Sequence, residues 1–179
     1  MARSAEPGRT ALLDAGATLA DSGGLRGLSV NAIVAEAGMA KGSFYQHFPS
    51  RRDFVVALHR RYHDQITARV LETVGNLPHG ADRLRSGVEA FLDACLETKG
   101  TKAFLAQART ETDLLEEVQS RNALVGAELA ADLVALGADQ PDAKAHLVVA
   151  MVADISLQEL YDDGPRSDLR AALYALLRL

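Results

Sequence analysis

Residues 38–54, GMAKGSFYQHFPSRRDF, decide the fold. Gly38 can end a preceding helix, and Pro49 ends the short helix that the apolar spacing predicts over residues 41–48. Because residues four apart share one face of a helix, Phe44 and Phe48 are expected to point inward. They would meet apolar residues of the preceding helix, namely Ile33, Val34 and Ala37. Two helices joined by such a tight turn match the helix-turn-helix arrangement, in which the second helix enters the major groove of DNA.

The opposite side of the short helix carries polar residues. Donors suited to phosphate oxygens and base edges fall there, and one glycine among them allows the backbone to approach DNA closely. These residues are Lys41, Gly42, Ser43, Tyr45, Gln46 and His47. Any exposed helix also turns polar residues outward, so the pattern alone leaves an ordinary surface helix as the alternative.

Helices are also expected on both sides of this stretch. A first helix is predicted over residues 9–22, where Gly23 and Gly24 would stop it, and Ser29 would cap a second helix. Ser50 would cap the next helix, which runs to Gly75 without a breaker. That helix would hold about 25 residues and reach about 37 Å.

The rest of the chain has the same helical character. Apolar residues recur at helical spacing nearly everywhere, and the alternation typical of strands is almost absent. The expected helices cover residues 81–98, 102–109, 112–136, 141–161 and 166–179. The sequence therefore predicts an all-α fold of about nine helices.

Composition and charge are those of a folded protein with an uneven charge distribution. Of the 179 residues, 48% are hydrophobic and 24% charged, values ordinary for globular proteins. Residues 1–61 hold eight Lys or Arg and five Asp or Glu, a net charge of +3, whereas residues 62–179 hold 11 and 19, a net charge of −8. A basic N-terminal part suggests an anionic partner for that part.

Several features favour a cytoplasmic location. The single cysteine, Cys95, cannot form an internal disulfide, and the N-terminal sequence MARSAEPGR lacks the apolar core of a secretion signal. The most apolar run, residues 145–153, is far too short to span a bilayer. No membrane partner is expected.

The N-terminal quarter of the chain resembles a known family. From Leu12 to Phe54, LLDAGATLADSGGLRGLSVNAIVAEAGMAKGSFYQHFPSRRDF is similar over 43 consecutive positions to the N-terminal domain of the tetracycline-repressor-like (TetR) family of bacterial regulators. The shared features are a first helix closed by glycine, a serine opening the second, AEAG at the turn, and KGSFYQHF. The resemblance implies a DNA-binding domain over residues 1–50 and a helical ligand-binding and dimerisation domain over residues 51–179.

The resemblance also implies roles for single residues on a double-stranded DNA operator. Base edges would face Lys41, Gly42, Ser43 and Gln46, and phosphates would meet Ser29, Val30, Tyr45, His47 and Arg51. One position departs from the family pattern, because Ala40 stands where serine is frequent. The third helix then lacks a side-chain cap that typically contributes about 1 kcal/mol.

A homodimer through the last two predicted helices is expected. One helix-turn-helix covers few base pairs, and dimers place two of them about 34 to 36 Å apart. Apolar stripes that could pair two copies contain Val148, Met151, Val152, Ile155 and Leu160, and then Leu169, Leu173, Leu176 and Leu177. The family resemblance implies the same interface, and the alternative is that these stripes form the core within one chain.

A small-molecule pocket is expected in the helical body. Apolar walls with a few polar groups are typical of such pockets. The candidate residues are Tyr62, Ile66, Phe91, Cys95, Phe104, Gln107, Leu115, Met151 and Gln158. Each residue alone is equally compatible with ordinary core packing.

The resemblance implies a repressor that a bound ligand releases from its operator. A coupling free energy of about 1 to 3 kcal/mol would lower DNA affinity roughly 5- to 150-fold. The alternative is a dimeric DNA-binding regulator without a small-molecule effector, controlled by its abundance or by a protein partner. A filled core and a pocket use the same residues, so the sequence leaves both open.

An enzyme is not expected. His59 and His63 have the spacing of a two-histidine metal site, but Arg60, Arg61 and Tyr62 lie between them where a zinc protease would place a glutamate. A third ligand at matching spacing is not visible. The sequence also contains no phosphate loop, dinucleotide motif or nucleophile elbow. We therefore expect no catalytic site, cofactor or bound metal.

Overall fold

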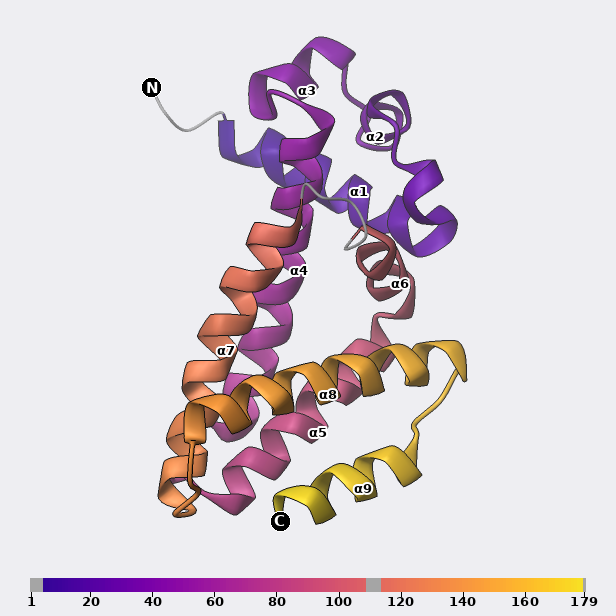
Figure 1. Ribbon diagram of the computed structural model, residues 1–179. Helices are drawn as coiled ribbons and strands as arrows, with labels where there is room; N and C mark the ends of the chain where they lie inside the picture. The colour runs from indigo at the N-terminus through magenta and orange to yellow at the C-terminus, as the bar shows by residue number, and fades with distance from the viewer. Residues whose placement is uncertain (1–4, 109–113, 179) are drawn as a thin grey trace. The chain divides into compact units, whose positions relative to one another are not determined.

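The computed structural model describes residues 5–108 and 114–178, and of residues 5, 22–27, 104, 105, 107 and 108 it describes the backbone alone. These ranges contain nine helices and no strand (Figure 1). The helices are α1 (Ala5–Gly27), α2 (Val30–Glu36), α3 (Lys41–His47), α4 (Arg51–Val74), α5 (Ala81–Glu97), α6 (Lys99–Ala108), α7 (Leu115–Ala135), α8 (Pro141–Tyr161) and α9 (Ser167–Leu177). The predicted all-α fold is confirmed. Within the described ranges, none of these helices is both long and apolar enough to cross a bilayer.

The chain folds into two compact units. The first contains Met1–Asp64 and Thr98–Leu114, and the second contains Gln65–Glu97 and Leu115–Leu179. The first unit therefore includes α6 in addition to the helices around the helix-turn-helix. The functional division between residues 1–50 and 51–179 stays a prediction.

Three phenylalanines form the centre of the first unit. Phe44, Phe48 and Phe54 are each at most 2% exposed, and their ring centroids lie 5.0 to 5.6 Å apart. Aromatic rings at such separations attract one another beyond the area that they bury. Gly16 of α1 allows this cluster to form, since a β-carbon there would lie only 2.4 Å from Cζ of Phe54.

The first helix is longer than the sequence predicts. We expected it to stop at Gly23 and Gly24, but α1 continues to Gly27. A glycine inside a helix costs only about 1 kcal/mol, which tertiary packing can offset. Here the later part of α1 packs against α6 (Figure 1).

Asp21 and Gly100 form the contact between α1 and α6. The carboxylate of Asp21 accepts hydrogen bonds from the backbone amide of Thr101 at 2.7 Å and from its hydroxyl at 2.9 Å. A β-carbon at Gly100 would lie 2.4 Å from Cα of Asp21, so the two backbones are in close contact. The bond from Asp21 caps α6, which explains why α6 begins at Lys99 and not at the predicted Lys102. The predicted helix ends at Arg109 and Thr112 lie outside the described residues.

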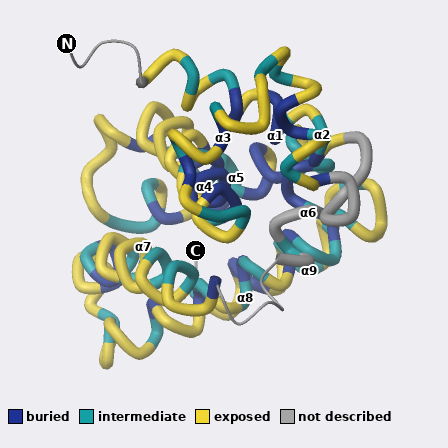
Figure 2. The backbone as a smooth tube through the Cα atoms, turned by 90° about the horizontal axis from the view of Figure 1, so that it is seen from above, coloured by how far each residue is buried: buried dark blue, intermediate teal, exposed yellow. Residues whose placement is uncertain are grey.

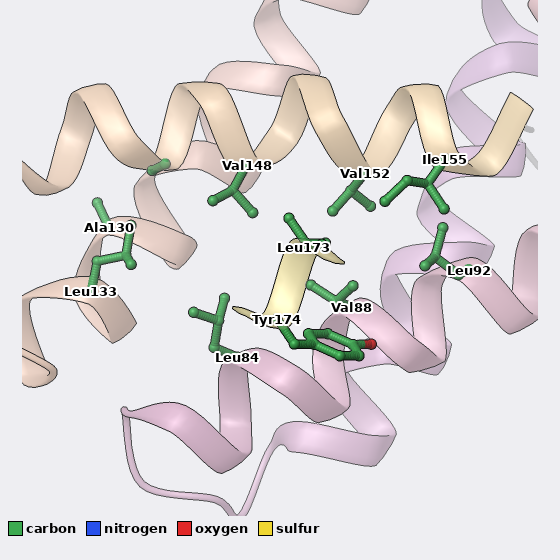
Figure 3. Packing of buried hydrophobic residues seen from close by; sticks show 11 residues of the cluster. Leu84, Val88, Leu92, Ala130, Leu133, Val148, Val152, Ile155, Leu173 and Tyr174 are labelled. Atoms are coloured by element: carbon green, nitrogen blue, oxygen red, sulfur yellow. The ribbon is translucent and has the colours of Figure 1, made fainter. Parts of the chain in front are cut away.

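The core of the second unit is mainly aliphatic (Figure 3). Four helices contribute to it: α5, α7, α8 and α9. Its residues are Leu84, Val88, Leu92, Ala130, Leu133, Ala145, Val148, Val152, Ile155, Leu173 and Tyr174. Helices α7 and α8 pack against each other, and α8 also packs against α5.

Two buried carboxylates in the second unit are neutralised by arginines. Glu159 is fully buried and accepts hydrogen bonds from Nε and Nη2 of Arg170 at 2.6 and 2.9 Å and from the amide of Arg166 at 3.0 Å. Arg170 also donates to Asp93 at 2.7 Å, which links α9 to α5 as well as to α8. Asp132 of α7 is 2% exposed and accepts from Arg83 of α5 at 2.8 Å. The arrangement satisfies both buried charges, which would otherwise be costly.

Candidate nucleic-acid interface

The turn between α2 and α3 is built on Gly38, as predicted. Its φ angle is 64°, a left-handed value that favours glycine. The amide of Met39 donates to the carbonyl of Val34 at 2.8 Å, and the amide of Gly38 donates to Ala35 at 3.2 Å. This pair of bonds is the Schellman motif, which closes a helix and turns the chain sharply. The turn thereby directs the chain from α2 into α3.

The inner side of α3 is buried as the spacing predicts. Phe44 is fully buried, and Phe48, directly after the helix, is 2% exposed. Ile33 and Val34 of α2 are also buried, whereas Ala37 is half-buried. The aromatic cluster with Phe54 supports α3 from beneath and leaves its other side for contacts outside the chain.

The outer side of α3 is polar and accessible. Lys41, Gly42 and Gln46 are exposed, and Tyr45 is 51% exposed. Ser43 and His47 are half-buried. A β-carbon at Gly42 would contact nothing within 4 Å, so the backbone there is open to close approach. Ammonium, hydroxyl and amide groups on one accessible helix face can donate hydrogen bonds to base edges and phosphates.

The two helix starts beside α3 differ in their capping. Ser29 caps α2, because its hydroxyl accepts a hydrogen bond from the amide of Ala32 at 3.1 Å. Ser50 caps α4 and forms a reciprocal pair with Asp53, with distances of 3.2 and 2.7 Å. Both caps agree with the sequence prediction. Ala40 gives α3 no side-chain cap, also as predicted.

Arg51 is tied to the chain segment that precedes α2. Its Nε donates to the carbonyl of Leu28 at 2.7 Å, a bond that is partly buried. Val30, which lies two residues after Leu28, is half-buried at the first turn of α2. The structure therefore brings Arg51 close to the start of α2, where the family resemblance expects a phosphate.

Contacts between α1 and the end of α3 were not anticipated from the sequence. The guanidinium carbon of Arg9 lies 5.1 Å from the ring centroid of Phe48. A β-carbon at Gly8 would lie 2.5 Å from Nε2 of His47 and 3.4 Å from Cε of Met39. The sequence signal was weak, because Gly8 lies before the predicted start of the first helix.

The predicted pocket residues are only partly described. Tyr62 is buried, and its hydroxyl shares a 2.8 Å hydrogen bond with that of Thr98 in the first unit. In the second unit Ile66 and Cys95 are buried, whereas Phe91, Met151 and Gln158 are half-buried. Leu115 is 52% exposed, because it lies in the first turn of α7 and faces outward. The side chains of Phe104 and Gln107 lie outside the described residues.

The predicted dimer stripes are mostly core of a single chain. Val148, Val152, Ile155 and Leu173 are buried in the aliphatic cluster, and Met151, Leu169 and Leu177 pack partly buried against it. The four buried residues agree with the intrachain alternative, and the homodimer interface stays a prediction. The pattern showed which residues share a helix face but could not tell which neighbour covers that face.

Other apolar side chains of α8 and α9 are exposed instead. Leu147 is 59% exposed and Tyr161 74% on α8, and Leu176 is 72% exposed on α9. Leu176 is the one member of the predicted stripes that is a large, strongly exposed apolar residue among the described residues. Exposed positions are frequent along α7 and α8 in Figure 2.

The rings of His59 and His63 in α4 contact each other. His59 is 1% exposed, and its ring centroid lies 4.4 Å from that of His63. Among the described residues there is no group of three side chains that could hold a metal ion.

The comparison with known protein families agrees with the geometry. Residues 12–58 match the model of the bacterial regulatory proteins of the tetR family. This match covers about a quarter of the chain, so the similarity to this family is shown for the N-terminal part. The matched segment runs from the buried Leu12 of α1 to the buried Leu58 of α4, so it contains the whole of α2 and α3.

Two curated relatives share part of the sequence of this chain. The chain is 36% identical over 89 residues to the HTH-type transcriptional repressor KstR2 of Rhodococcus jostii, which is 50% of this chain and 42% of KstR2. It is 31% identical over 70 residues to the HTH-type transcriptional activator FasR of Mycolicibacterium smegmatis, which is 39% of this chain and 32% of FasR. The alignments thus span less than half of either relative.

The fold similarity extends over nearly the whole chain. The crystal structure of the multidrug binding protein EbrR complexed with imidazole matches with a TM-score of 0.77 and 26% identity. The match covers 94% of this chain and 93% of EbrR. The similarity in fold therefore continues beyond the helix-turn-helix.

Proposed function

We propose that the protein is a homodimeric transcriptional regulator that binds a specific double-stranded DNA operator through α3. One observation carries the proposal: an accessible polar face on a short helix whose other side rests on buried phenylalanines. Such a helix can enter the major groove without exposing its apolar support. The match of residues 12–58 to a family of bacterial regulatory proteins supports the same function.

The outer residues of α3 divide into two roles in this proposal. Lys41 and Gln46 hydrogen-bond to base edges, where lysine suits guanine and glutamine suits adenine. Ser43 accepts either partner, and Gly42 allows close approach. Tyr45 contacts the sugar-phosphate backbone from the exposed side of the helix.

Further phosphate contacts come from the start of α2 and α4. Ser29 and the amide of Val30 meet one phosphate, and the guanidinium of Arg51 reaches the same strand. The bond from Arg51 to Leu28 supports this grouping, because Leu28 directly precedes Ser29. A guanidinium already held by a hydrogen bond to the backbone loses less conformational entropy when it binds an anion.

The dimer forms through exposed side chains of α8 and α9. Leu147, Tyr161 and Leu176 are among the most exposed large apolar residues of the described chain. Burial of such residues against a second copy would remove apolar surface from water. Two copies then present two α3 helices to one operator.

The oligomeric state tests this interface. Size-exclusion chromatography with light scattering should give twice the 19.1 kDa chain mass. Leu147→Asp places a charge in the proposed interface and should reduce the value to one chain mass. A single chain mass for the wild type would reject the homodimer.

A small-molecule effector bound in the helical body regulates DNA binding. EbrR, which shares the fold, is by its name a multidrug binding protein. Within the second unit, the remaining candidates for the site are Ile66, Phe91, Cys95, Met151 and Gln158. Leu115 is exposed, so its side chain would have to turn inward to line the site.

Repression is the proposed effect on transcription, because a dimer on its operator occludes a promoter. The name of KstR2 supports repression, whereas FasR is named as an activator. A reporter placed behind the selected operator distinguishes the two, since a repressor lowers its expression and an activator raises it. A function on DNA places the protein in the cytoplasm.

Selection from random DNA tests the function. Duplexes bound by the purified protein are amplified and sequenced over several rounds, and a shared motif with two half-sites is expected. Tyr45→Ala should weaken binding to all duplexes and flatten the salt dependence, whereas Gln46→Ala should mainly relax the sequence preference. Failure to enrich any motif would reject sequence-specific DNA binding.

Compound screening then tests regulation by an effector. The protein is held on its selected duplex, and compounds that release it are sought by loss of fluorescence anisotropy. A hit should lower DNA affinity 5-fold or more, the lower end of about 5 to 150 typical of allosteric coupling. The same hit must fail to release a Phe91→Ala variant at equal concentration if it binds in the proposed site.

A further inference from the structure

The first turn of α1 contacts the C-terminal end of α3 at two points. Nε2 of His47 lies so close to Gly8 that a β-carbon there would approach it to 2.5 Å. The guanidinium of Arg9 lies 5.1 Å from the ring centroid of Phe48. Figure 1 shows the start of α1 running beneath α3. Both contacts lie within the first compact unit.

The orientation of α3 depends strongly on such contacts. The helix has only seven residues and no side-chain cap at Ala40. Helices of this length are not stable by themselves, so packing must hold them. Phe44 and Phe48 anchor the inner side of α3, but one buried side alone permits rotation of a short helix about that side. A contact at the end of the helix restricts this rotation.

We propose that Gly8 and His47 brace α3 and that His47 positions the helix for base recognition instead of contacting phosphate. The inference rests on the proposed function and assigns two positioning residues to that same site. The tip of the imidazole lies against the backbone of α1, so that edge of the ring is occupied within the chain. Lys41 and Gln46 sit on the same seven-residue helix, so a small rotation about its anchored side would move both from their base edges.

The test compares four proteins: wild type, Gly8→Ala, His47→Ala and the double variant. Affinities are measured by fluorescence anisotropy for two duplexes of equal length, one selected by the wild type and one unselected, across a series of salt concentrations. Gly126→Ala is the matched control, because Gly126 lies in α7 with nothing within 4 Å of its added β-carbon. Thermal melting reports whether each variant is folded.

The brace predicts a loss of selectivity with unchanged salt dependence. Gly8→Ala and His47→Ala should each weaken binding to the selected duplex about tenfold, equivalent to about 1.4 kcal/mol. Binding to the unselected duplex should change less than about twofold, since its affinity comes mainly from phosphate contacts. Removing the imidazole makes room for the methyl group that Gly8→Ala adds, so the double variant should bind no more weakly than His47→Ala alone. Such non-additivity is expected of residues in direct contact.

Other results would overturn the inference. If His47 contacts phosphate, His47→Ala weakens binding to both duplexes equally and lowers the salt slope by about 0.9. Additive losses in the double variant, or a Gly8→Ala variant that binds like the wild type, would likewise exclude a brace. If Gly8→Ala does not fold, the salt slope and selectivity of His47→Ala carry the decision.

The experiment separates this inference from the proposed function. When the wild type selects a motif but the variants behave as phosphate contacts, only the brace is rejected. When the wild type selects no motif at all, the DNA-binding function fails and the brace fails with it.

Discussion

In the first compact unit, helices approach closely at small residues and around an aromatic cluster. The second unit instead has a mainly aliphatic core and two buried carboxylates that are paired with arginines. Gly16 fits against Phe54 and Gly100 against Asp21, with no space for a β-carbon at either position. The second unit buries Glu159 and Asp132 and satisfies each with an arginine. The two units therefore differ in what a mutation can damage. Volume is critical in the first and charge balance in the second.

Arg170→Ala should have the largest effect on stability. It leaves the fully buried Glu159 without its arginine, and removal of one partner of a buried pair typically costs about 3 to 5 kcal/mol. Urea denaturation followed by circular dichroism would measure the loss. Arg166→Ala is the control, because its guanidinium binds the exposed Asp162 and Asp168 while its amide still donates to Glu159. Equal effects of the two substitutions would contradict the importance that we assign to buried charge.

Gly100→Ala should have the next largest effect on stability. It should destabilise the first unit because the added methyl group has no space. Its β-carbon would meet the backbone of Asp21, which cannot move as easily as a side chain. Overpacking of this kind typically costs about 1 to 3 kcal/mol. The same denaturation experiment applies. Gly126→Ala should instead stabilise the protein by about 0.5 to 1 kcal/mol, because alanine favours a helix and the site is open.

Ser29→Ala should cost about 1 kcal/mol, the usual loss of a helix cap. A second substitution separates the contribution of Ser29 to stability from its contribution to DNA binding. Ser29→Asp keeps an acceptor for the amide of Ala32 and should retain stability, but its charge should repel a phosphate and weaken DNA binding. If Ser29→Asp binds the selected duplex as the wild type does, Ser29 does not lie beside a phosphate.

Tyr174→Phe should have the smallest effect at neutral pH. The hydroxyl is buried without a hydrogen-bond partner among the described residues, so its removal should be neutral or slightly stabilising. The ring contact with Arg85, 4.5 Å from the centroid, is available to phenylalanine as well.

Alkaline pH should separate Tyr174→Phe from the wild type. Burial, with the charge of Glu89 as a further cause, raises the pKa of Tyr174 from 10.0 to about 12. Because the pKa of Tyr174 is higher in the folded state, the contribution of its neutral hydroxyl to stability is complete below pH 10. That contribution is lost as the pH rises to about 12. The wild type should therefore lose stability relative to Tyr174→Phe across that range. Parallel curves for the two proteins would show that the hydroxyl titrates normally.

Local signals predicted the first unit well around the helix-turn-helix. Gly38, Ser29 and Ser50 each have a conformational or capping role that depends on near neighbours, and all three predictions are confirmed. The bounds of α8, Pro141–Tyr161, were also predicted correctly, because a proline starts the helix and the apolar spacing continues without a break. Such features are encoded within a few residues.

Predictions that depended on distant residues were wrong or incomplete. The continuation of α1 through Gly23 and Gly24 accompanies packing against α6, about 80 residues later in the chain. Val148 and Val152 lie on an apolar stripe that the sequence could not assign to the core or to a second copy. The partners of Glu159 were likewise invisible, since nothing in the local pattern distinguishes a buried glutamate from an exposed one.

The assignment of α6 to the first unit affects which segments could be recombined between proteins of this fold. The chain leaves that unit after Asp64 and returns to it at Thr98, so the unit is not one continuous stretch. A chimera that joins only residues 1–50 to the remainder of another protein would lack the residues that contact Asp21, namely Gly100 and Thr101. Grafting the segment from Thr98 to Leu114 along with it would preserve the fit, and recombination between relatives should favour crossovers that keep these two pieces together.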